Sequence, residues 1–139
     1  MKSQIRMEGL TLTVGDVTRS KEYYKKLGFV CLLNAAPNFA LVQPKNSKGA
    51  TIGLLSWHEA AKDGAVRATP KQRRAIHVEL STDDLDGLYK KLVAKGIKFH
   101  APPHDEPWER SATAFDPDGY SVEFAQGRRR KNNLQKSKK

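Results

Sequence analysis

The chain has 139 residues, of which 38% are hydrophobic, enough for one domain or for two small halves that share a core. Its single cysteine, Cys31, excludes an internal disulfide and a cysteine-rich zinc site, fits a reducing compartment, and is expected in the core of an apolar strand. No stretch approaches the roughly 20 apolar residues of a membrane-spanning helix, and the N-terminus lacks the apolar run of a signal peptide. We therefore expect a cytoplasmic protein with no membrane partner.

The basic charge is concentrated at the end of the chain. The net charge is +10, and residues 127–139 contain seven basic residues and no acidic one. The remainder, residues 1–126, therefore carries only 10 − 7 = +3. Few apolar residues accompany the basic ones, so we expect a disordered tail. Such a tail could contact nucleic acid weakly through phosphates, with an affinity that falls steeply with salt.

The first half of the chain predicts a strand, a helix and three more strands. Residues 5–14 alternate apolar and polar side chains, and residues 17–27 predict a helix capped by Asp16 or Thr18 and ended by Gly28. Further strands are predicted at residues 29–33, 39–42 and 50–56. The connection that follows, 57–74, is expected to be helical at 58–62 and basic and exposed at 70–74.

The second half repeats this order. A strand at 75–80 is followed by a helix at 82–94, with Thr82 as its cap and Gly96 after its end. Strands follow at residues 97–100, 108–115 and 119–125, with a proline-rich loop at 101–107. The last strand comes directly after the strong turn signal Asp-Pro-Asp-Gly at 116–119.

An internal duplication accounts for the repeated order. A shift of 68 residues places Asp16 on Asp84 and Gly28 on Gly96, and both helices contain the run Tyr-Lys-Lys-Leu. The sequence thus predicts an α+β fold with two βαβββ modules in tandem, with curled mixed sheets enclosing a cleft as the favoured arrangement. The predicted parts are a first module at 1–57, a linker at 58–74, a second module at 75–126 and the basic tail at 127–139.

Three of the predicted strands carry polar side chains on the face opposite their apolar residues. If the sheets curl, these polar faces line one concave pocket; if the sheets stay flat, the same residues face water. The polar residues are Thr11, Thr13, His77, Glu79, Ser121 and Glu123.

With these residues the chain resembles the vicinal oxygen chelate superfamily, which includes glyoxalase I, extradiol dioxygenases, fosfomycin-resistance enzymes and bleomycin-resistance proteins. The resemblance spans about residues 5–126. It is carried by residues 10–17, 23–29, 76–78, 84–86, 95–97 and 116–123. Since members of this family often dimerise, the resemblance implies a homodimer.

The resemblance also implies a divalent-metal site, as in the metal-dependent members, with ligands from the first, fourth, fifth and eighth strands. Carried over to this chain, the last two positions are His77 and Glu123, whose side chains suit zinc, nickel, manganese or iron. The other two positions fall on Gly9 and on residues 53–55, which offer no ligand. Two protein ligands are fewer than the three of catalytic zinc sites. The candidates for a missing ligand are Glu79, His58 and His104.

Two main functions remain open. The preferred one is binding of a small molecule in the cleft between the modules, as in the bleomycin-resistance branch, without a complete metal site and with no cofactor. Its predicted ligand-binding residues are Thr11, Thr13, Trp57, Glu79, Trp108, Arg110 and Ser121. The alternative is a metal-dependent glyoxalase-like lyase or isomerase, in which His77 and Glu123 hold the metal and Glu123 also carries a proton. A dioxygenase is less favoured because its facial triad needs a second histidine, and nucleic-acid binding by the basic tail is a further alternative.

Overall fold

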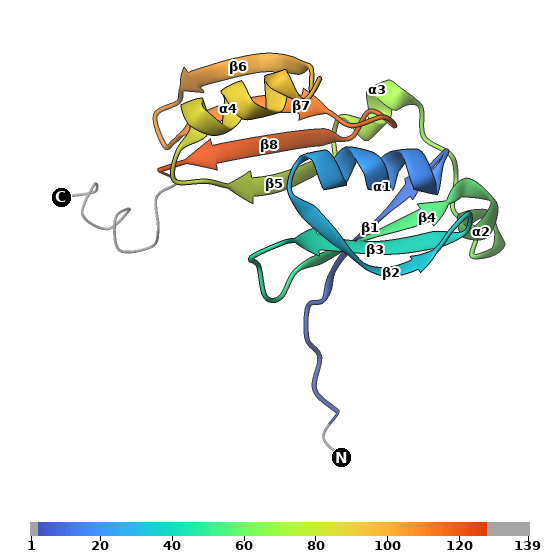
Figure 1. The fold of residues 1–139 in the computed structure, drawn as a ribbon. Helices are drawn as coiled ribbons and strands as arrows, with labels where there is room; N and C mark the ends of the chain where they lie inside the picture. The colour runs from blue at the N-terminus through green and yellow to red at the C-terminus, as the bar shows by residue number, and fades with distance from the viewer. Residues whose placement is uncertain (1–2, 128–139) are drawn as a thin grey trace. The chain divides into compact units, whose positions relative to one another are not determined.

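The computed structural model describes residues 3–127, so the prediction of a disordered tail falls outside the described residues except for Gly127. The chain divides into two compact units, Met1–Ala68 and Thr69–Lys139, and the division falls within the segment predicted as a linker. Each unit contains one four-stranded mixed sheet and its own helices (Figure 1). The two units are described separately below.

The first unit builds its core between one sheet and one long helix. Its elements are β1 (Gly9–Val14), α1 (Val17–Lys26), β2 (Phe29–Ala35), β3 (Phe39–Pro44), β4 (Thr51–Ser56) and α2 (Trp57–Lys62). The strand order is β1-β4-β3-β2, with β1 parallel to β4 and the other pairs antiparallel. Asp16 caps α1 by accepting a hydrogen bond from the Arg19 amide, and Tyr24 of this helix is fully buried with Val14 and Leu54 of the sheet.

The second unit repeats this arrangement. Its elements are α3 (Pro70–Arg73), β5 (His77–Ser81), α4 (Leu85–Ala94), β6 (Phe99–Asp105), β7 (Arg110–Phe115) and β8 (Ser121–Gln126). The strand order β5-β8-β7-β6 matches that of the first unit, again with one parallel pair, β5 and β8. Helix α4 packs on β6, β7 and β8 and buries Leu85 and Leu92 (Figure 1). The predicted α+β fold of two βαβββ modules is therefore confirmed.

Several predicted boundaries are wrong. Strand β1 begins at Gly9 rather than at residue 5, and Ile5 is 97% exposed, so the first apolar side chains have no sheet to pack against. The loop predicted at 101–107 is mostly strand, because β6 is an edge strand and its register shifts absorb the two prolines. The cap of α4 is Asp84, which accepts from the Gly87 amide, and not Thr82.

Two burial predictions are also wrong. Cys31 is exposed, because β2 is the edge strand of the first sheet and every residue of β2 after Phe29 is exposed. The segment at 70–74, predicted to be basic and exposed, is exposed except at Arg73, so that prediction is wrong only for this residue of the short helix α3.

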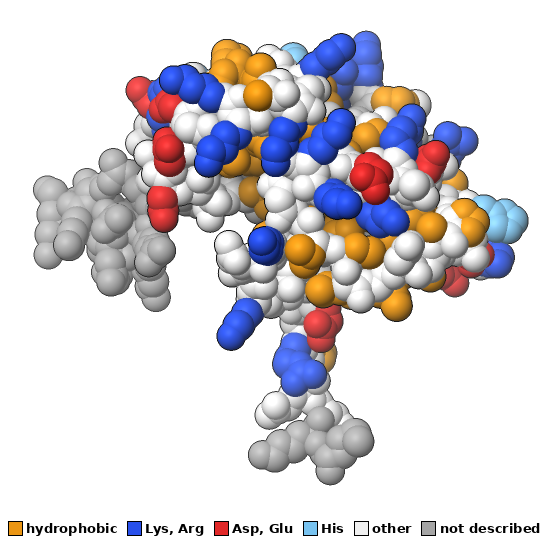
Figure 2. Space-filling model, viewed as in Figure 1, with side chains coloured by type: hydrophobic (Ala, Val, Ile, Leu, Met, Phe, Trp, Pro, Cys, Tyr) orange, Lys and Arg blue, Asp and Glu red, His pale blue; other side chains and the backbone are white. Residues whose placement is uncertain are grey.

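Each unit carries exposed basic side chains on its long helix. Figure 2 shows lysines and arginines in the regions of α1 and α4, and exposed residues of this kind include Lys25, Lys26, Lys90 and Lys91. Within residues 3–127, no helix is long and apolar enough to cross a membrane.

Candidate metal and ligand site

The sheet face of the second unit opposite α4 carries polar side chains in regular rows. The parallel pairing of β5 with β8 places His77 beside Ser121 and Glu79 beside Glu123. The antiparallel pairing of β8 with β7 adds Phe115 beside Ser121 and Thr113 beside Glu123. Paired residues share a face of a sheet, so the predicted polar face of the second module is one continuous surface.

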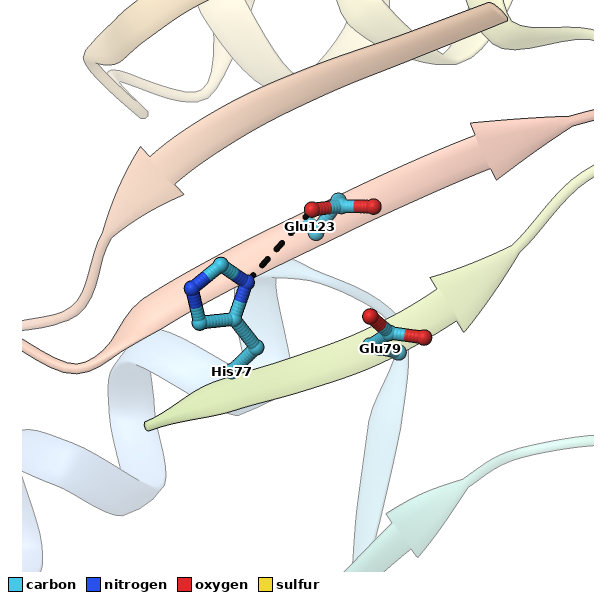
Figure 3. A group of neighbouring side chains, drawn as sticks. All are labelled: His77, Glu79 and Glu123. Carbon is cyan, nitrogen blue, oxygen red and sulfur yellow. Dashed lines mark ion pairs between the residues drawn. The ribbon is translucent and has the colours of Figure 1, made fainter. Parts of the chain in front are cut away.

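Three ligand-bearing side chains converge on this face. His77, Glu79 and Glu123 each offer one ligand atom, and these atoms lie within 4.8 Å of one another. The His77 Nδ1 atom is 3.5 Å from Glu123 Oε2. Figure 3 shows His77 and Glu79 on β5 and Glu123 on the neighbouring β8, all on one side of the sheet. One imidazole and two carboxylates equal the number of protein ligands in catalytic zinc sites and suit zinc, manganese or iron, so this donor set fits a divalent metal.

A third carboxylate, Glu109, adds to the negative charge of the cluster. Glu109 is only 8% exposed and hydrogen-bonds to Glu123. Glu109 lies before β7, in the turn closed by hydrogen bonds between the backbones of residues 106 and 109. It falls within the strand predicted at 108–115, but the sequence assigned it no role there. Residues 109, 111 and 113 alternate with their neighbours along the chain, so an extended backbone would place Glu109 on the same polar face as Ser111 and Thr113.

The environment of Glu123 raises the pKa of its carboxyl group. Burial is the largest cause, followed by the hydrogen bond with Glu109 and the negative charges of Glu79 and Glu109; the His77 hydrogen bond opposes these effects. A chain with a net charge of +10 thus gathers three carboxylates at one position. A bound cation would relieve their mutual repulsion.

This environment makes the stability of the metal-free protein depend on pH. The folded protein holds the proton of the Glu123 carboxyl group more tightly than the unfolded chain does. This difference adds to the free energy of unfolding at pH values below the ordinary pKa of 4.5, and the contribution is lost as the pH rises through the raised pKa of the folded state. Glu123→Gln removes the repelling charge. We therefore expect the metal-free variant to equal the parent in stability at low pH and to exceed it increasingly as the pH rises. Urea unfolding at several pH values measures this, and an unchanged difference across the pH range would contradict it.

The first unit has no corresponding ligands. In its sheet, Gly9 of β1 pairs with Thr51 of β4, as His77 of β5 pairs with Ser121 of β8. Thr11 pairs with Gly53, as Glu79 pairs with Glu123. By this correspondence Gly9 replaces the histidine, and Gly53 replaces the glutamate of β8. Gly9 has φ +153°, and a Cβ atom there would lie 1.8 Å from the Thr51 carbonyl oxygen. The backbone at Gly9 therefore has no room for a ligand side chain.

The other predicted site residues lie in varied surroundings. Thr11 is exposed and Thr13 half-buried on β1, and Trp57 of α2 lies 5.6 Å from the Arg67 guanidinium. Trp108 is 56% exposed. His58 lies on α2 of the first unit. Their predicted contacts with a ligand remain predictions, as does the cleft between the modules.

Arg110 and His104 have close partners away from the cluster. The Arg110 guanidinium donates to Asp86 of α4, at 3.2 and 3.0 Å, and to Asp105, at 3.0 Å. The two nitrogens of His104 lie 2.8 Å from the Pro102 carbonyl oxygen and 3.1 Å from Glu106 Oε1. Arg110 therefore links β7 to α4 and β6, whereas His77, Glu79, Ser121 and Glu123 are the predicted site residues that the second sheet brings together.

Comparison with known proteins gives the same fold. A glyoxalase/bleomycin resistance protein/dioxygenase from Nocardioides is 26% identical, with a TM-score of 0.74 over 91% of this chain and 85% of that chain. A member of the same superfamily from Sphaerobacter thermophilus DSM 20745 is also 26% identical, with a TM-score of 0.68 over 88% of this chain and 98% of that chain. TnmS3, an antibiotic binding protein from Streptomyces sp. CB03234, is 22% identical, with a TM-score of 0.70 over 91% of this chain and 98% of that chain.

No curated protein matches the chain. The sequence model of one family does match, over residues 6–124, which is nearly all of the two modules. The repeated βαβββ units, the solved relatives and this match agree with the resemblance found in the sequence. The chain belongs to the glyoxalase/bleomycin resistance protein/dioxygenase superfamily.

Proposed function

We propose that this protein binds an oxygen-bearing small molecule on the polar face of the second sheet, through a divalent cation held by His77, Glu79 and Glu123. The observation that carries the proposal is the convergence of three ligand atoms within 4.8 Å. Glu79 adds the third ligand to the pair expected from the sequence. All three come from neighbouring strands of one unit, so the set is complete without a residue of the first unit.

The reaction class that these residues support best is a glyoxalase-like lyase or isomerase reaction. A bound divalent cation supplies Lewis-acid stabilisation of negative charge that develops on a substrate oxygen. A carboxylate that ligates a metal is deprotonated, so Glu123 can carry a proton only when it is released from the cation. In the metal-free protein, burial and Glu109 raise the pKa of its carboxyl group. Glu109 hydrogen-bonds to that carboxyl group. The Ser121 hydroxyl, in the row next to Glu123, donates to the Arg74 carbonyl oxygen and can still accept a hydrogen bond.

Metal content tests this proposal. The untagged protein is exposed to zinc, nickel, manganese or iron(II), desalted and analysed for its elements. We expect about one metal ion per chain. Metal affinity should fall more than roughly 100-fold in each of the variants His77→Ala, Glu79→Gln and Glu123→Gln, because removal of an outer-shell partner alone can cost that much.

The matched control is His104→Ala. His104 also pairs with a glutamate, at 3.1 Å from Glu106, but it belongs to no group of three ligands among residues 3–127. The control variant should retain the metal. Absence of retained metal in the parent protein, or equal loss in the control, would contradict the proposal.

Metal-free ligand binding is the second candidate. Its support is the lack of ligands at Gly9 and Gly53, together with the fold shared with the antibiotic binding protein TnmS3. In this case His77 and Glu123 form an ion pair that contacts the ligand directly. Antibiotic binding that changes tryptophan fluorescence and is insensitive to metal removal would favour this candidate.

Assembly and tail function are separate proposals. The predicted homodimer is checked by light scattering. The predicted weak nucleic-acid contact is checked by comparing the full chain with one that ends at Gln126, and unchanged binding after truncation would reject a role for the tail.

A further inference from the structure

Two adjacent arginines at the end of α3 have opposite environments. Arg73 is 5% exposed, and its Nε atom donates to the Asp118 carbonyl oxygen. Arg74 is exposed, and its guanidinium lies 4.4 Å from the centroid of the Phe115 ring. The His100 ring also contacts Phe115, with centroids 4.8 Å apart. The aromatic ring thus gives the exposed Arg74 side chain a preferred position.

The charge of Arg74 is not neutralised by the fold. In the described part of the chain, no acidic side chain forms an ion pair with Arg74, in contrast to Arg110, which pairs with Asp86 and Asp105. The contact with the Phe115 ring is a cation–π interaction, which needs no N–H donor of the guanidinium. The N–H donors lie in the guanidinium plane and stay available for bidentate recognition of a carboxylate or phosphate.

The backbone places Arg74 beside the row that contains His77. Ser121 Oγ donates a hydrogen bond to the Arg74 carbonyl oxygen, at 2.7 Å. Ser121 also pairs with His77 on one side and with Phe115 on the other. Two strand spacings of about 4.8 Å therefore separate the backbones of His77 and Phe115, or roughly 10 Å.

We infer that Arg74, supported by Phe115, binds an anionic oxygen group of the ligand, a carboxylate or a phosphate, while the ligand's other end reaches His77, Glu79 and Glu123. The inference rests on the proposed function for the second of these contacts, although the anion site itself uses no metal. The ligand class is then a small acid with a negative group at one end and an oxygen that reaches the cluster at the other.

Titration of the metal-free protein with inorganic phosphate and, separately, with acetate tests the anion site. Chemical shifts or heat report binding, and the two probes distinguish a phosphate from a carboxylate preference. We expect Arg74→Gln to weaken binding of the preferred anion about tenfold or more, and Arg74→Lys to recover only part of it, because lysine keeps the charge but lacks the planar fork. Thermal unfolding of each variant verifies that it is folded.

Arg67→Gln is the matched control, because Arg67 is also exposed and lies over an aromatic ring, that of Trp57, at 5.6 Å. It should leave anion binding unchanged. Equal weakening by both glutamine variants, or absence of binding by both probes, would overturn the inference.

Repeating the titration with manganese added separates the anion site from the metal site. Arg74-dependent binding without retained manganese would uphold the anion site and reject the metal proposal. Retained manganese without any Arg74-dependent anion binding would support the metal site and reject the anion site. If both sites are present, a linear dicarboxylate long enough to span them should bind more tightly than acetate, and Arg74→Gln should remove this advantage.

Discussion

Gly119→Ala is expected to lower the free energy of unfolding by about 3 kcal/mol or more. Gly119 has φ +96°, which is strained for any residue with a Cβ atom. An added Cβ would also lie 2.7 Å from the Pro70 carbonyl oxygen and 3.1 Å from Pro70 Cα, both backbone atoms. The substitution must therefore displace the start of α3 from the turn that precedes β8. Chemical denaturation monitored by circular dichroism measures the loss.

Gly96→Ala separates strain from collision. Gly96 has a similar φ, +89°, but no atom lies within 4 Å of the position of an added Cβ. We expect this variant to lose only the strain energy of a left-handed residue, about 1–2 kcal/mol. Equal losses of unfolding free energy in the two variants would show that the close approach of Pro70 to Gly119 does not contribute to the effect of Gly119→Ala.

Arg73→Ala is the second substitution with a large expected effect, about 2–4 kcal/mol of unfolding free energy. Arg73 is buried beside the turn at 116–119, where Asp116 and Asp118 are 4% and 5% exposed. Its Nε atom donates to the Asp118 carbonyl oxygen, and its guanidinium lies 6.0 Å from the centroid of the Tyr120 ring. Removal of the side chain takes a cation and a donor from a region that water cannot easily reach. Urea denaturation measures the change in stability.

The control for this prediction is the neighbouring Arg74→Ala. Because Arg74 is exposed and makes no ion pair within residues 3–127, its removal should change the unfolding free energy by no more than about 0.5 kcal/mol. If Arg74→Ala destabilises the protein as much as Arg73→Ala, the assignment of one arginine to folding and the other to anion binding is wrong.

The contact between α3 and the turn also bears on the candidate site. Asp116 Oδ1 accepts hydrogen bonds from the amides of Asp118 and Tyr120, at 2.9 and 3.0 Å, and thereby shapes the turn. The turn leads directly into β8, which carries Ser121 and Glu123. Gly119 and Arg73 hold α3 against this turn, so the same packing that stabilises the unit positions Arg74 next to the polar face.

The sequence alone determined the fold and half of the candidate site. Alternating side chains, capping residues and the shift of 68 residues predicted the two βαβββ modules, because strand parity and helix ends depend on local chemistry. Strand parity placed His77 and Glu123 among the polar-face residues, and the family resemblance then singled them out as expected metal ligands. These predictions required no knowledge of which strands are neighbours.

Only the tertiary structure decided which groups meet. The register between β5 and β8 places Glu79 beside Glu123, and the turn before β7 brings Glu109 to the same carboxylate. The burial of Arg73 and the exposure of Arg74 likewise follow from the packing of α3, which no periodic pattern in a helix of four residues can reveal. Side-chain clusters arise from contacts between segments distant in the chain, and one strand's pattern contains no information about its partner's register.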